Sequence, residues 1–164
     1  MFRKILLFLL VILVIIQFIH PKRNRTKDPQ SNNIGNKYQI PEDVKAILAK
    51  ACNDCHSNNT RYPWYTYTQP VDWWINNHIQ GGKKGLNFDE FNGKSLRYQY
   101  NKAGDIADLV KKGAMPLNSY LWIHKDARLT EDEKGKLIAW AEGIQDSLRA
   151  HNPIDSLLRP KRPA

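Results

Sequence analysis

Cys52-Asn53-Asp54-Cys55-His56 has the pattern C-x-x-C-H. Two thiols at this spacing can bond to the two vinyl groups of one porphyrin, and the adjacent imidazole can ligate the iron beneath the same ring. The pattern therefore predicts a single covalent haem c, attached through Cys52 and Cys55, with His56 as the proximal iron ligand.

Two other uses of closely spaced cysteines are alternatives to haem attachment. A thioredoxin-like redox pair would need a βαβ context, which the sequence does not show. A zinc site is the better rival, formed by both cysteines and two of the histidines His56, His78 and His124, but their spacing does not match the usual pair. Because the chain has only two cysteines, a framework of several disulfides is excluded.

Met115 is the leading candidate for the distal iron ligand. It follows a glycine-ended helix and precedes Pro116, whose fixed φ would help to hold the thioether toward the iron. The chain has only two methionines, and the other is the initiator. A methionine buried in the core is the alternative role for this residue. His78 is the alternative distal ligand, and bis-histidine ligation would lower the reduction potential.

The spacing of apolar residues predicts helices and no sheet, so the expected fold class is small and all-α. Four helices are expected: from Pro41 to Cys52, from Pro70 to the pair Gly81-Gly82, over residues 99–112, and after the capping box of Thr130 and Glu133. The last helix is expected to pack on the first. Residues 85–93 are expected to form a loop.

Aromatic residues follow the C-x-x-C-H pattern closely and are expected to line the haem pocket, because a porphyrin is large and flat. They are Tyr62, Trp64, Tyr65, Tyr67, Trp73 and Trp74. Arg61 and either Lys83 or Lys84 are candidates for pairing with the haem propionates, although exposed basic residues are usually only solvated.

The N-terminus has the layout of an export signal or short membrane anchor. Residues 5–19 are apolar except for Gln17, and Arg3 and Lys4 precede them. No small-x-small cleavage site follows, which favours a retained anchor over residues 1–20. Residues 21–37 are polar and are expected to be a flexible tether to a domain over residues 38–150, and residues 151–164 are expected to be a basic tail.

The positive charge of the chain lies mainly outside the expected domain. Residues 37–150 contain 16 basic and 14 acidic side chains, which leaves them a net charge of +2 out of +9 for the whole chain. Nucleic-acid binding needs basic residues concentrated on the folded face, so no nucleic-acid partner is expected.

The chain resembles bacterial haem-binding domain proteins of the cytochrome c type. The resemblance is carried by CNDCHSNNTRYPWY (52–65), PVDWWINNHIQGGKKGLNF (70–88), GAMPL (113–117) and HKDARLTEDE (124–133). It implies a cytochrome c-like helical domain that binds haem, in a small protein with one N-terminal membrane segment. The chain departs from the family pattern at Lys83 and Lys84, where a Gly-Arg pair is usual, and at Lys125, where proline is usual.

The expected function is single-electron transfer by a membrane-anchored domain, with membrane-associated redox proteins as partners. This favours an electron carrier over an enzyme. The alternatives are a peroxidase-like haem enzyme and a haem-based sensor or structural module. The domain is expected on the extracytoplasmic, periplasmic side of a single-pass anchor, because c-type haem is attached after export. The basic residues that follow the apolar run would by themselves indicate the opposite orientation.

Overall fold

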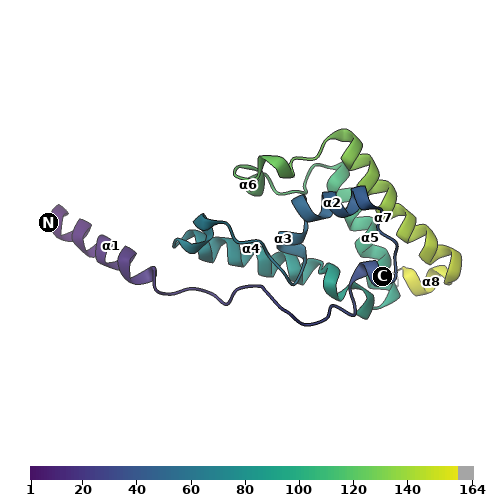
Figure 1. Ribbon diagram of the computed structural model, residues 1–164, viewed down its shortest axis with the longest axis horizontal. Helices are drawn as coiled ribbons and strands as arrows, with labels where there is room; N and C mark the ends of the chain where they lie inside the picture. Colours follow the sequence, from purple (N-terminus) through teal and green to yellow (C-terminus); the bar gives the residue numbers. More distant parts are fainter. Residues whose placement is uncertain (159–164) are drawn as a thin grey trace, which may run out of the picture.

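The computed structural model describes residues 1–158, and this part of the chain contains helices and no strand, which confirms the all-α prediction. The α-helices are α1 (Phe2–Ile16), α2 (Glu42–Ala51), α3 (Asn53–His56), α4 (Val71–Gly85), α5 (Leu96–Lys111), α6 (Asn118–Leu121), α7 (Glu131–His151) and α8 (Ile154–Leu157). Four 3₁₀ helices join them: η1 (Ile34–Asn36), η2 (Trp64–Tyr67), η3 (Phe88–Gly93) and η4 (Lys125–Ala127). Helices α2 to α8 form one body, and α1 projects away from it (Figure 1).

The core lies between α5 and α7, with α2 packed against α7. Leu137 and Ala141 of α7 are fully buried, and they meet an apolar stripe on α5 that includes Ala103 and Ile106. Burying one large aliphatic side chain contributes about 1.5–3 kcal/mol, so this long contact supplies much of the stability of the domain. The expected packing of the last helix on the first is present, but α5 is the larger partner of α7.

Two helix ends agree with the signals in the sequence. Thr130 and Glu133 form the predicted capping box at the start of α7. At the end of α5, Gly113 has a φ of +65°, and the amide of Ala114 donates to the carbonyl of Leu109. This is the glycine C-cap geometry that ends many helices. It turns the chain directly into Met115.

Helix α4 is longer than predicted, because it runs through Gly81 and Gly82 to Gly85. A Cβ atom on Gly82 would lie 2.6 Å from the carbonyl oxygen of Cys55, so glycine is needed here for α4 to approach α3 closely. The glycine pair marks a helix contact and not a helix end. The expected loop over 85–93 also differs, since η3 buries Phe88 and Phe91 in the core.

The segment predicted as a flexible tether is packed along the domain. Asn24 is 7% exposed, and its side-chain amide donates to the carbonyl of Ser57 and to the hydroxyl of Thr60. Asn33 donates to Asp89, and Ile34 is 1% exposed within the core. The polar composition of this segment suggested that it would be exposed to solvent. Its side-chain amides instead form hydrogen bonds with backbone and side-chain groups of the domain. We call residues 17–37 the N-terminal strap.

Helices α1 and α8 lie at the two ends of the described residues. Within residues 1–158, no helix is both long enough and apolar enough to cross a bilayer. The predicted basic tail begins with α8, whose Leu157 is fully buried against the core. The rest of that tail, residues 159–164, lies outside the described residues.

Candidate functional site

The C-x-x-C-H residues lie where α2 passes into α3. Cys52 is the last residue before the short helix α3, and Cys55 and His56 lie in its single turn. The turn is held by its neighbours, since the Thr60 hydroxyl donates to the Asp54 carbonyl at 2.6 Å and the Arg61 amide donates to the Asp54 carboxylate. Both thiols and the imidazole therefore come from one short, well-supported segment.

His56 has one ring nitrogen committed to the backbone. Its Nδ1 lies 3.0 Å from the carbonyl oxygen of Leu86, which accepts a hydrogen bond only if Nδ1 carries the proton. The other nitrogen, Nε2, is then unprotonated and able to bind a metal. Metal-binding histidines usually donate their second nitrogen to a carbonyl or carboxylate in this way. Burial lowers the pKa of His56, which favours the neutral form that a metal requires.

A cavity of about 470 Å³ opens beside these residues, between α2, α3, α4, α5 and the segment after α5. Its volume is in the range usual for cofactor sites. Cys52, Cys55, His56, His78 and Met115 all line it, so the structure brings together the two cysteines and every iron ligand predicted from the sequence. Most of the remaining wall is apolar: Leu48, Ala51, Leu86, Phe88, Ile106, Leu109, Val110, Pro116, Leu117 and Leu137.

The two cysteines are not joined to each other, and both are held as neutral thiols. Burial raises the pKa of Cys52 to about 12 and the pKa of Cys55 to about 11, and each is raised further by a neighbour, Cys55 and the Asp54 carboxylate respectively. Such thiols are poor nucleophiles at neutral pH. In the described part of the chain, no three His, Cys, Asp or Glu side chains form a group able to hold a metal ion, so the zinc set is not assembled there.

One wall of the cavity is formed by glycines of α4, which have no side chain. Gly81 and Gly85 lie one turn apart on α4 and both line the cavity, and a Cβ atom on either would meet nothing within 4 Å. A side chain at these positions would occupy the cavity. The combination of a flat glycine wall, two thiols, an imidazole and a thioether fits a planar iron porphyrin.

The aromatic cluster does not line this cavity, so that prediction was wrong. Tyr65 and Trp74 line a smaller neighbouring cavity of about 70 Å³. Tyr62, Tyr67 and Trp73 contact the N-terminal strap, and Trp64 is 83% exposed. These aromatics are close to the C-x-x-C-H pattern in sequence, but most of them precede α4, and α4 lines the cavity only with residues between Asn77 and Gly85.

The proposed propionate partners have other contacts. Arg61 pairs with Asp54, and Lys83 donates to the side chain of Asn24 at 2.6 Å. The cavity wall instead contains Lys102 and Asp105 of α5, which pair with each other at 2.8 Å. In the sequence, only the position of Lys102 and Asp105 beside the apolar stripe of α5 could have indicated that they line the cavity.

A polar network behind the cysteines was also missed. Tyr120 donates to Asp54 at 2.8 Å and stacks on the ring of His124, with ring centres 3.9 Å apart. The hydroxyl of Tyr65 lies 2.8 Å from Nε2 of His124. Burial and the Asp54 carboxylate raise the pKa of Tyr120 strongly, so this hydroxyl stays a donor. The network joins residues far apart in sequence, and no local pattern could have predicted it.

Comparison with known proteins agrees with this site. The haem-binding domain family matches residues 11–143, which include the strap, the C-x-x-C-H residues, the glycine wall and Met115. Neither the curated proteins nor the solved structures contain a match to the chain. The match spans most of the chain and the cavity offers the ligands that haem needs, so the chain belongs to the haem-binding domain family and is a haem-binding protein.

Proposed function

We propose that the chain holds one haem c covalently through Cys52 and Cys55 and transfers single electrons, with His56 as the proximal ligand and Met115 as the distal ligand. The observation that carries this proposal is the convergence of these four side chains on one apolar cavity, with Nδ1 of His56 already committed to Leu86. Bound haem would supply the one-electron redox chemistry.

The chain itself would contribute attachment, orientation and exclusion of water. Cys52 and Cys55 would hold the haem as thioethers, with the sulfur of each thiol on one vinyl carbon and its hydrogen on the other, so attachment would need no oxidant. The Leu86 carbonyl fixes the plane of the His56 ring and makes its free nitrogen more basic. Ile106, Leu109 and Val110 line the cavity from α5, and an apolar wall of this kind keeps water from the iron and tunes its potential.

We also propose that α1 anchors the protein in a membrane, with the haem domain on the extracytoplasmic side and membrane-associated redox proteins as partners. All 15 residues of α1 are without a buried side chain, although most of them are apolar. An apolar helix that packs on nothing is expected to enter a lipid phase. At ~1.5 Å per residue its length is ~22 Å, which is shorter than a ~30 Å hydrocarbon layer, so the bilayer would have to thin locally around α1.

The test is spectroscopy on the exported full-length chain. The parent is expected to retain haem on a denaturing gel and to show a sulfur-to-iron charge-transfer band at the red end of its oxidised spectrum. Met115→Ala is expected to keep the covalent haem, lose the band and lower the reduction potential, because a thioether ligand favours the ferrous state. His78→Ala is the matched control, since His78 lines the same cavity and is not the proposed ligand.

Each other result has a definite meaning. If His78→Ala changes the spectrum and Met115→Ala does not, His78 is the distal ligand. A parent without a sixth ligand that turns over peroxide would favour the peroxidase-like alternative, and an iron that exchanges its distal ligand without passing electrons would favour the sensor. Loss of all haem on the denaturing gel would contradict covalent attachment.

A further inference from the structure

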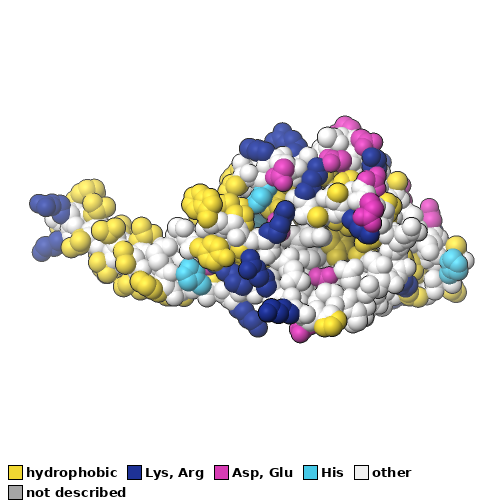
Figure 2. All heavy atoms as spheres, viewed as in Figure 1, with side chains coloured by type: hydrophobic (Ala, Val, Ile, Leu, Met, Phe, Trp, Pro, Cys, Tyr) yellow, Lys and Arg dark blue, Asp and Glu magenta, His cyan; other side chains and the backbone are white. Residues whose placement is uncertain are grey.

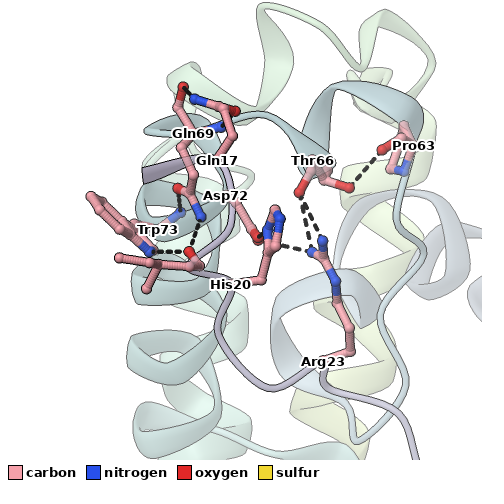
Figure 3. Close-up of polar contacts among 9 residues, drawn as sticks. Gln17, His20, Arg23, Pro63, Thr66, Gln69, Asp72 and Trp73 are labelled. Carbon is pink, nitrogen blue, oxygen red and sulfur yellow. Dashed lines mark hydrogen bonds and ion pairs between the residues drawn. The ribbon is translucent and has the colours of Figure 1, made fainter. Parts of the chain in front are cut away.

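The N-terminal strap and the start of α4 are joined by a buried ion pair (Figure 3). Asp72 is 1% exposed, and its two carboxylate oxygens are 2.8 Å from Nη1 of Arg23 and 2.7 Å from Nδ1 of His20. Arg23 also donates to the carbonyl of Thr66 in η2. A buried carboxylate that lost these partners would be costly, so the contact favours one arrangement of strap and domain.

Three more hydrogen bonds fix the residues directly after α1 (Figure 3). Gln17 accepts from the amide of Gln69 at 3.0 Å, and the Gln69 side chain donates to the carbonyl of Ile19 at 2.6 Å. The indole of Trp73 donates to the same carbonyl at 3.0 Å. Helix α1 is therefore connected to the domain by a bonded segment and not by a free tether.

Large apolar side chains surround this junction and remain exposed. We call Phe18, Ile19, Trp64, Tyr67 and Trp73 the aromatic rim, and their exposed fractions are 82%, 53%, 83%, 51% and 39%. Trp64 and Tyr67 are three residues apart in η2, and residues at this spacing in a 3₁₀ helix lie on the same side. Tyr67 is held by Arg23, which lies 4.4 Å above its ring, so the rim has a fixed place beside the strap.

Basic side chains accompany the rim. Lys22, Arg25 and Lys27 are exposed in the strap, and Arg25 lies 5.2 Å from the ring centre of Tyr62. Figure 2 shows hydrophobic and basic side chains gathered on the part of the body nearest α1. Aromatic residues with a polar edge and adjacent basic residues are the composition found at the surface of lipid bilayers.

We infer that the aromatic rim inserts into the headgroup layer of the membrane that holds α1, so that the haem domain lies against the bilayer in one fixed orientation. The inference rests on the membrane attachment proposed above and adds a lipid contact made by the folded domain. The rim is continuous with the apolar surface of α1, which identifies lipid as its occupant. The distance of the cavity from the membrane would then be fixed, and redox partner proteins would have to approach the cavity at that distance.

The experiment is photo-crosslinking of the full-length chain in vesicles of phosphatidylcholine with phosphatidylglycerol. Trp64→p-benzoylphenylalanine places a photoreactive ring in the rim. Ile154→p-benzoylphenylalanine is the matched control, because Ile154 is also exposed, at 46%, and lies on α8 at the end of the body opposite α1 (Figure 1). Flotation of the vesicles first establishes whether the chain is membrane-bound.

About tenfold more lipid adduct is expected from position 64 than from position 154, since an aromatic side chain at the interface touches lipid continuously. Equal, low yields from both positions in chain that floats with the vesicles would overturn the inference while leaving the anchor intact. Chain that does not float would overturn the proposed membrane attachment itself, and the two failures are thus distinguished. Adduct at both positions would show a domain without fixed orientation, which also contradicts the inference.

Discussion

Asp72 shows how a single buried charge can organise a segment that looks disordered in sequence. A carboxylate that is only 1% exposed loses its hydration and needs charged donors in return. Arg23 supplies a charged donor and His20 a second polar contact, both from a polar stretch with no hydrophobic period. The sequence alone predicted a tether there because the pairing spans about 50 residues and leaves no local pattern.

Asp72→Asn is expected to destabilise the full-length chain by about 1–3 kcal/mol, since it weakens hydrogen bonds to a charged group and leaves Arg23 without its partner. The measurement is denaturant unfolding in detergent, followed by circular dichroism. Asp108→Asn is the control, because Asp108 and Lys112 form a pair whose side chains are 70% and 69% exposed. That substitution should cost less than about 0.5 kcal/mol. Equal effects of the two substitutions would show that the buried pair does not hold the strap.

The residues of the site divide into those with a local signature and those without one. Cys52, Cys55 and His56 follow from their spacing, and Met115 follows from being the one internal methionine. The Leu86 carbonyl that orients His56 could not be predicted, because any residue can offer a carbonyl and only the fold selects this one. The aromatic cluster was misplaced because proximity in sequence does not determine which segment meets the cavity, and α4 reaches it with residues between Asn77 and Gly85.

At the scale of helices, the contact between α3 and α4 depends on Gly82. Its missing side chain lets the backbone of α4 lie directly on Cys55, which brings the glycine wall of the cavity against the C-x-x-C-H residues. Glycine weakens a helix by about 1 kcal/mol relative to alanine, so the close approach must compensate for this cost.

Gly82→Ala is expected to destabilise the domain by about 1–3 kcal/mol and to reduce the yield of covalent haem, because the new methyl group overpacks the contact with Cys55. Gly135→Ala is the control: Gly135 lies in α7, and a Cβ atom there meets nothing within 4 Å. The control should be neutral or stabilise by up to about 1 kcal/mol. Denaturation midpoints and haem staining check both variants. A stabilised Gly82→Ala with normal haem content would refute the close-approach argument.

Helix boundaries were predictable where a cap fixes them. Thr130 with Glu133 and Gly113 each satisfy backbone groups at a helix end, and both ends are where the sequence placed them. The end of α4 was misplaced because a glycine pair can serve either as a stop or as a contact, and the choice depends on what packs against it. Helix η3 was missed because its buried Phe88 and Phe91 lie in a short segment without helical period.

At the scale of the whole molecule, the size of the cavity makes its occupant important for the stability of the domain. A closed apolar cavity costs about 24 cal/mol per Å³, so ~470 Å³ corresponds to about 10 kcal/mol, which is comparable to the total stability of a typical domain. Opening to solvent reduces this figure, but haem is expected to be part of the core and not a late addition to a finished fold.

The chain produced without covalent haem is therefore expected to retain most of its helical signal in the far ultraviolet, to lose near-ultraviolet circular dichroism and to unfold over a broad temperature range. The haem-loaded chain under the same conditions is the reference. A haem-free chain that melts sharply at the same temperature as the loaded chain would contradict this prediction and indicate a preformed, rigid pocket.

The N-terminal strap also bears on the order in which the protein is built. Asn24 pairs with Ser57 and Thr60, and Asn33 pairs with Asp89, so every one of these partners leaves the ribosome after the strap itself. The strap cannot close until residue 89 has been synthesised, whereas Cys52 to His56 emerge more than thirty residues earlier. The nascent chain thus presents its C-x-x-C-H residues while its first segment is still open, and that segment can close only after they have emerged.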